Sequence, residues 1–140
     1  MPLSPYAPTV LTDARCRQLL RSVDLGRLLL SLDAMPVAFP VNYRLVDDDT
    51  IVFRTSQGTK LSRALDRRLV GFEIDQVDSA EASGWSVLVL GIATVVTDPE
   101  ELARLRDLDI RSLSREDLPF FVKIEVHRVS GRHVGPEAPC

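Results

Sequence analysis

The stretch RLLLSLDAMPVAFPVNYRLVDDDTIVFRT, residues 27–55, decides the fold. It holds three apolar runs, and short polar turns separate them at 33–36 and 47–49. Apolar runs bounded by such turn residues are typical of β-strands, and strands joined by short turns lie antiparallel. The predicted strands are 27–32, 37–46 and 50–55.

The rest of the chain extends this antiparallel meander. Three further runs have strand character, at 69–77, 85–96 and 120–129, and Gly91 inside the second of them predicts a bulge or bend. We expect the strands to form a small closed or nearly closed β-barrel.

Three short helices are predicted around this barrel. Thr12 has the position of an N-cap for a helix over 13–22, and Asp98 followed by Pro99 and two glutamates predicts a second. A third is expected to begin near Thr59, after the loop that contains Gly58.

Composition narrows the class of protein. The chain has 140 residues and a formal net charge of -3, without the basic stripe of a nucleic-acid-binding protein. No apolar stretch approaches the ~20 residues of a membrane span, and Met1 to Tyr6 do not resemble a signal peptide. We therefore expect one cytoplasmic domain over 1–140, with loose tails at 1–10 and 134–140.

Cysteine, histidine and carboxylate residues give no catalytic or metal-binding pattern. Cys16 lies on the apolar side of its helix and is expected to be a small buried hydrophobe, and Cys140 ends the chain. The two histidines, His127 and His133, lack metal-site spacing. The acidic residues between 75 and 81 are interpreted as a solvated loop, and no catalytic residue is assigned.

Residues 53–60, FRTSQGTK, form the stretch most suggestive of a binding site. They lead from a strand end into a helix N-terminus, where unpaired N–H groups and the helix dipole favour a phosphate. Hydroxyl groups and the two cations Arg54 and Lys60 add donors that suit an anion. The plainer interpretation, that Thr59 only caps a helix and Lys60 is a solvated charge, has equal standing on spacing alone.

Three motifs in order resemble one family. They are FPVNY at 39–43, IVFRTSQGTKL at 51–61 and SGWSVLVLG at 83–91. Together they resemble the pyridoxamine 5′-phosphate oxidase-like flavoproteins, in particular the short bacterial branch with nitroimidazole-reductase-like members. The likeness covers roughly residues 10 to 133.

The resemblance implies a mainly β (α+β) fold, a six- to seven-stranded antiparallel split β-barrel with three short peripheral helices. It also implies a homodimer with FMN sites between the subunits. Position by position, it implies a ribityl-phosphate site at Arg54, Thr55, Ser56, Thr59 and Lys60. The ring would lie along Pro40, Val41 and Asn42, with Trp85 and Ser86 reaching in from the other subunit and His133 as a candidate contact.

The chain also departs from the family pattern. It lacks the C-terminal Arg-x-Glu-x-Trp segment of the true oxidases, so vitamin B6 oxidation is not implied, and their Arg-Lys phosphate pair is reduced to Thr59-Lys60. Three functions remain open. They are an FMN oxidoreductase acting on a small molecule with a reduced nicotinamide, a reductase that uses the deazaflavin coenzyme, and a non-enzymatic flavin or haem binder.

Overall fold

Seven strands run through the residues that the computed structural model describes, which are 8–55, 63–110 and 120–136. The sheet order is β1-β7-β4-β3-β2-β5-β6, and pairing of β6 with β7 closes six of the strands into a barrel. The mainly β split-barrel fold expected from the sequence is confirmed. The strands are β1 (Thr9–Val10), β2 (Leu25–Leu32), β3 (Met35–Val46), β4 (Thr50–Thr55), β5 (Arg68–Asp78), β6 (Ser83–Val95) and β7 (Phe120–Val134).

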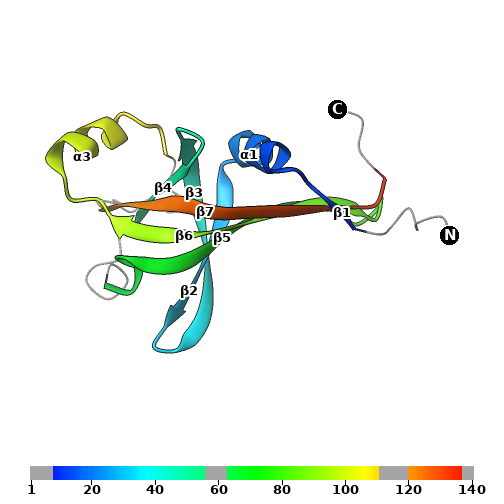
Figure 1. Cartoon of the computed structure of the whole chain (residues 1–140), viewed down its shortest axis with the longest axis horizontal. Helices are drawn as coiled ribbons and strands as arrows, with labels where there is room; N and C mark the ends of the chain where they lie inside the picture. Colours follow the sequence, from blue (N-terminus) through cyan, green and yellow to red (C-terminus); the bar gives the residue numbers. More distant parts are fainter. Residues whose placement is uncertain (1–7, 56–62, 111–119, 137–140) are drawn as a thin grey trace.

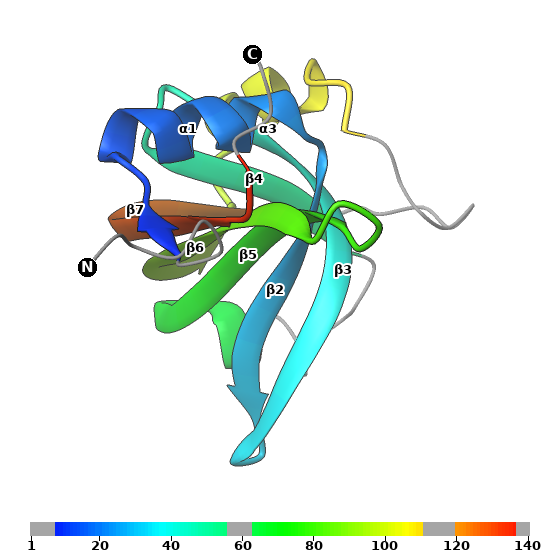
Figure 2. The ribbon, with the colours of Figure 1, turned by 90° about the vertical axis from the view of Figure 1, so that its right-hand side faces the viewer.

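Tight turns join the first strands of the barrel. Asp33 and Ala34, which link β2 to β3, both have positive φ, and so do Asp47 and Asp48 between β3 and β4. Two residues with positive φ match the twist of antiparallel strands, which explains why these hairpins close so sharply. The β2–β3 hairpin extends away from the barrel (Figure 2).

The long strands β5, β6 and β7 form an antiparallel meander (Figure 1). The register between β6 and β7 shifts at Leu90/Gly91, which confirms the bulge predicted at Gly91. A Cβ at Gly91 would lie 2.1 Å from the Glu125 carbonyl oxygen. Only glycine lets the two backbones approach this closely.

Alternate residues of each strand fill the barrel. In β6, for example, Val87 and Val89 are buried, whereas Ser86 and Leu88 point outward. The buried residues of the main core include Leu28, Tyr43, Ile51, Phe53, Phe72, Ile74, Val122 and Ile124.

Helix α1 (Asp13–Ser22) covers one end of the barrel (Figure 2). The Thr12 hydroxyl accepts from the Arg15 N–H, as the sequence predicts for an N-cap. Cys16 is fully buried beneath the helix, as predicted, and a Cβ at Gly131 would lie 2.7 Å from its sulfur. Burial raises the pKa of the Cys16 thiol, which keeps it neutral.

Helix α3 (Pro99–Arg106) covers a second, smaller apolar cluster on the outside of β4 and β7. Asp98 accepts from the Glu101 N–H at 2.9 Å, which confirms the predicted cap. Leu105 packs on Val52 and Phe121 and closes this side of the barrel.

Two details differ from the sequence-based expectations. The last strand continues to Val134 instead of ending near 129, and Thr9 and Val10 pair with it as β1 instead of lying in a loose tail. The extended β7 backbone offers hydrogen-bond partners to this N-terminal segment, since the Leu11 N–H donates to the Gly131 carbonyl.

Of the third predicted helix, residues 63–65 are helical and the earlier part lies outside the described residues. None of the helices in the described ranges is long and apolar enough to cross a membrane.

Candidate functional site

Strands β3 and β4 separate where the predicted ring and phosphate residues meet. Their pairing runs from Val46↔Thr50 to Tyr43↔Phe53 and stops there. Beyond this point Arg54 and Thr55 pair with β7, while Pro40, Val41 and Asn42 pair with β2. Asn42 and Arg54 are therefore the first residues on either side of a split in the barrel wall.

The β3 backbone presents hydrogen-bonding groups to this split. The Tyr43 N–H donates to Asp24 on the β2 side, so the alternation of an antiparallel strand turns the main-chain groups of Asn42 and Pro40 the other way. Among the described residues, no strand pairs with this edge before Tyr43. The split thus offers the Asn42 N–H as a donor and the Pro40 carbonyl as an acceptor, whereas the main-chain groups of Val41 face β2.

Arg54 and Thr55 are held in place on the other side of the split. The Arg54 guanidinium lies 4.9 Å from the centre of the Phe121 ring, a cation–π contact that orients the side chain. Thr55 is the buried polar residue at the end of β4, with 8% of its surface exposed. Ser56, Thr59 and Lys60, the other predicted phosphate residues, lie outside the described residues.

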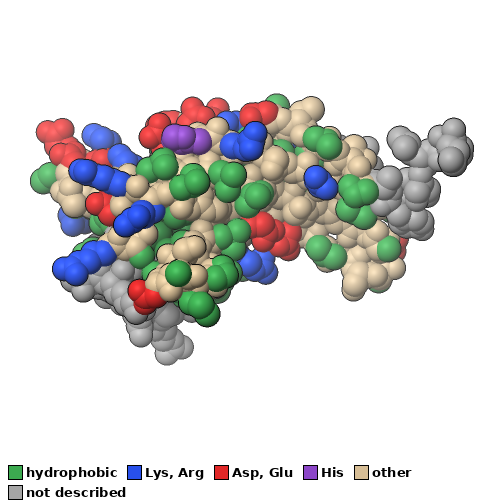
Figure 3. Space-filling model, turned by 60° about the horizontal axis from the view of Figure 1, so that its bottom comes forward, with side chains coloured by type: hydrophobic (Ala, Val, Ile, Leu, Met, Phe, Trp, Pro, Cys, Tyr) green, Lys and Arg blue, Asp and Glu red, His purple; other side chains and the backbone are tan. Residues whose placement is uncertain are grey.

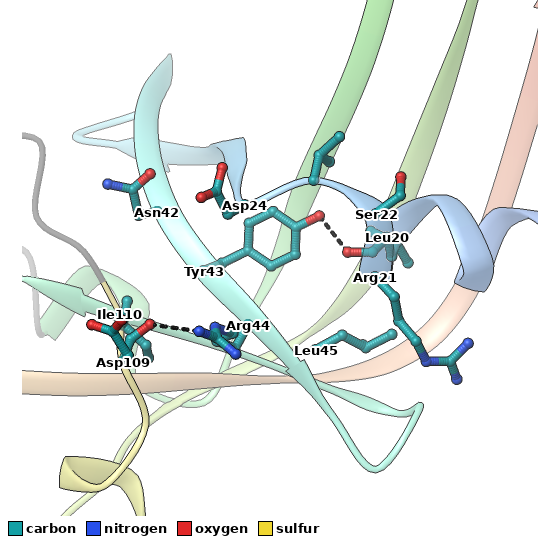
Figure 4. A pocket seen from close by; sticks show the side chains of 11 residues that line it. Leu20, Arg21, Ser22, Asp24, Asn42, Tyr43, Arg44, Leu45, Asp109 and Ile110 are labelled. Atoms are coloured by element: carbon teal, nitrogen blue, oxygen red, sulfur yellow. Dashed lines mark hydrogen bonds between the residues drawn. The ribbon is translucent and has the colours of Figure 1, made fainter.

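A pocket of about 470 Å³ adjoins Asn42 (Figure 4). The end of α1, β3 and residues 109–110 line it. The Tyr43 hydroxyl donates to the Leu20 carbonyl at 2.7 Å, and the Arg44 guanidinium donates to the Asp109 carbonyl at 3.0 Å. These bonds fix the walls of the pocket beside the split.

Tyr43 is one of the polar residues that line this pocket. Burial, together with the nearby Asp24, raises the pKa of Tyr43, so its hydroxyl stays protonated. Neither cysteine nor histidine lies among its lining residues. The described lining of the pocket offers hydrogen-bonding and charged groups that could contact a ligand.

Trp85, Ser86 and His133 lie together in a second place. Trp85 is opposite His133 in the β6–β7 ladder, and Ser86 is opposite Arg132. Neighbouring residues of a strand face opposite ways. Trp85 accordingly packs, half-buried, against the main core, while Ser86 is exposed on the outside and lines a pocket of about 510 Å³.

Within one chain the Trp85 group lies far from Arg54 along β7. Arg54 is opposite Phe121 near the start of β7, and Trp85 is opposite His133 near its end. Twelve residues of extended strand separate those two positions, which is about 40 Å along β7. Figure 1 shows β7 crossing the molecule from one end to the other.

The structure adds a charged cluster that the sequence interpretation missed. Asp75 lies in β5, inside the strand predicted over 69–77 and not in the solvated loop interpreted between 75 and 81, and its carboxylate accepts from Arg27 at 3.0 Å. Glu73, two residues earlier, lies 3.6 Å from the same guanidinium. The alternation at the end of β5 places both carboxylates on one face, but only strand pairing brings Arg27 to them.

Across the described ranges, no group of three or more histidine, cysteine or acidic residues could hold a metal ion.

Comparison with known proteins gives consistent matches. The family model described as pyridoxamine 5′-phosphate oxidase matches residues 12–133. An uncharacterised protein of Mycobacterium tuberculosis is 41% identical over 96 residues, which cover 65% of this chain and 62% of that relative. The match thus spans less than two thirds of the relative's length.

Two solved structures superpose along nearly their whole length. The FAD-binding protein of Mycobacterium smegmatis has a TM-score of 0.74 and 35% identity, covering 90% of this chain and 98% of that one. A conserved protein of unknown function from Corynebacterium diphtheriae has a TM-score of 0.76 and 33% identity, covering 91% and 98%.

Proposed function

The chain belongs to the pyridoxamine 5′-phosphate oxidase family, and from that premise we propose that it is a flavin-dependent oxidoreductase. The observation that carries the proposal is the split between β3 and β4, which sets Asn42 beside Arg54. A flavin would supply hydride and electron transfer, and the protein would supply binding and orientation.

The residues at the split fit the two ends of a flavin nucleotide. The ring edge carries carbonyl oxygens and an N–H, which are complementary to the Asn42 N–H and the Pro40 carbonyl. The phosphate needs a separate cationic pocket, and in this proposal Arg54 and Thr55 form its described side. In this proposal Ser56, Thr59 and Lys60 complete the phosphate site.

The proposal includes a homodimer. Trp85, Ser86 and His133 are too far along β7 from Arg54 to join the same site in one chain. A second copy can supply them, and a ring between two chains is shielded from water on both sides. Each dimer then has two equivalent composite sites.

FMN is the cofactor that the sequence motifs favour. The FAD-binding relative from Mycobacterium smegmatis makes FAD the second candidate, and the pocket beside Asn42 is the space nearest to the split for an additional nucleotide. A deazaflavin coenzyme or a non-enzymatic binding role would use the same split. The substrate is a small molecule, with a reduced nicotinamide as electron donor.

Cofactor titration tests this function. The purified protein, stripped of ligand, is titrated with FMN, FAD and a deazaflavin while Trp85 emission is recorded, because Trp85 is the only tryptophan. We expect saturable quenching by FMN or FAD and nicotinamide oxidation by the loaded protein. Saturation without nicotinamide oxidation would favour a binding role, and no saturation by any of the three would refute a flavin function.

A further inference from the structure

A pocket of about 510 Å³, which we call the outer groove, lies where the turn between β5 and β6 meets the end of β7. Much of its wall is apolar. Val77 is opposite Gly84 in the sheet, Gly84 is opposite Val134, and Pro8 before β1 also belongs to the lining. The half-buried Trp85 adds an aromatic side chain. Pockets of this volume hold small molecules.

Three carboxylates and one guanidinium complete the lining of the outer groove. Glu73, Asp75 and Asp78 supply the carboxylates, and Arg132 supplies the guanidinium. Arg27 on β2 lies outside the lining, 3.0 Å from Asp75 and 3.6 Å from Glu73. When all these groups are ionised, two cations face three anions. One negative charge therefore lacks a counter-charge.

The charges are separated across the groove. Asp75 is opposite Ser86 on β6, and Ser86 is opposite Arg132 on β7. Arg132 thus lies two strand spacings, about 10 Å, from Asp75, so the carboxylates gather on the β5 side. Figure 3, which brings the lower side of Figure 1 forward, shows acidic side chains near the middle of the molecule with apolar side chains to both sides. A ring in the outer groove would meet carboxylates at one end only.

These features fit an apolar molecule that ends in a protonated amine. Covering a carboxylate costs free energy unless a donor or a cation meets it, and an ammonium group is both. The face of an aromatic ring such as that of Trp85 also attracts cations. The same carboxylates repel anions, so the phosphate end of a flavin does not suit this place.

We propose that the outer groove binds apolar small molecules that carry a protonated amine, and that such amines are the class of substrate that meets the flavin. The proposal rests on the proposed function, in whose dimer Trp85 and Ser86 of one chain reach the flavin of the other. Both residues line the outer groove, so a molecule held there lies beside the ring. Glu73 and Asp75 hold the amine, and Arg27 competes with it for them.

Protons compete with the amine for one of these carboxylates. Burial, with Asp75 adding to it, raises the pKa of Glu73 to about 7. Facing Glu73 are Arg27 from β2, Asp75 from its own strand and the uncharged Leu88 and Ser86 from β6. Glu73 gains its charge as the pH rises through 7. The affinity for an amine should therefore rise by about tenfold from pH 6 to pH 8.

Three probes of similar size and different charge test the proposal. Isothermal titration calorimetry on the full chain without added flavin compares 2-phenylethylamine, a cation, with neutral 2-phenylethanol and anionic phenylacetate at pH 8. We expect the amine to bind at least about tenfold more tightly than the other two, because it alone makes charge-assisted hydrogen bonds with carboxylates. Its binding should also change the emission of Trp85. Equal affinity of the amine and the alcohol, or no saturation by the amine, would overturn the proposal.

Two substitutions should change the affinity for the amine in opposite directions. Asp75→Asn removes a charge and should weaken binding by about tenfold, whereas Arg27→Met removes the competing cation and should tighten it. Asp107→Asn, the same change at the exposed C-cap of α3, is the matched control and should bind as wild type does. A merely structural role of the cluster would weaken binding in both variants or in neither.

The remaining outcomes are also decisive. Circular dichroism checks folding, and if a variant is unfolded, the pH profile of wild type decides. An affinity for the amine that is the same at pH 6 and pH 8 contradicts the proposal. Binding of flavin without binding of the amine refutes this proposal alone. Binding of the amine without binding of any flavin refutes the proposed function, and with it the substrate role, while the amine site stands.

Discussion

Replacing Arg54 by methionine is the sharpest single perturbation of the proposed phosphate site. Methionine keeps the apolar contact with Phe121 and removes the guanidinium that lies 4.9 Å above its ring. A charge-assisted hydrogen bond contributes about 1.5–3 kcal/mol, so the flavin dissociation constant should rise by roughly 10- to 150-fold. The lost cation–π contact should lower the free energy of unfolding by only about 0.5–1 kcal/mol.

Two measurements on the same preparations separate these effects. Flavin fluorescence titration gives the dissociation constant, and urea denaturation gives the free energy of unfolding. Arg54→Lys should recover part of the affinity, because an ammonium keeps the charge but not the fork of donors. Arg68→Met, at the exposed start of β5, is the matched control and should bind flavin as wild type does. If Arg54→Met binds as tightly as Arg68→Met, Arg54 does not contact the phosphate.

Four further changes test the phosphate site, the helix packing, a turn and a partly buried carboxylate. Replacing Thr59 and Lys60 together by alanine should weaken flavin binding by about tenfold or more without altering the melting temperature, and unchanged affinity in the titration would remove them from the site. Gly131→Ala should lower the free energy of unfolding by about 1–3 kcal/mol in urea, because the added methyl group meets the Cys16 sulfur at 2.7 Å and a backbone oxygen at 3.0 Å. Ala34→Gly should raise it by about 0.5–1 kcal/mol, since Ala34 has a φ of 63°, and a lower urea midpoint would contradict that. The folded chain raises the pKa of Glu73 to about 7. The free energy of unfolding in urea, measured at low protein concentration, should therefore fall between pH 5 and 7 and level off above pH 7, whereas that of Glu73→Gln should show no such fall.

Local chemistry made much of the fold predictable. Caps such as Thr12 and Asp98 act through bonds within three residues, so their effect is visible in the sequence. The bulge at Gly91 was likewise signalled by one residue type. The extension of β7 to Val134 was not, because its support comes from pairing with two distant segments, the start of β6 on one side and β1 on the other.

The candidate site was predictable only as separate segments. Motifs indicated which residues could take part, but the register of β3 against β4 decides that Asn42 lies beside Arg54. The same holds for Arg27, Glu73 and Asp75, which come from two strands and form one cluster only through long-range pairing. A carboxylate such as Asp75 gives no sign in the sequence of the arginine that it will meet.

In the proposed dimer each flavin lies between two chains. A mixed dimer tests it most directly, with one chain carrying Trp85→Phe and the other Arg54→Met, at a flavin concentration that fills only the sites with Arg54. The remaining indole then belongs to the chain that does not hold the phosphate. We predict that its emission is quenched as flavin saturates, and an indole of full intensity beside saturated flavin would show that the site lies within a single chain.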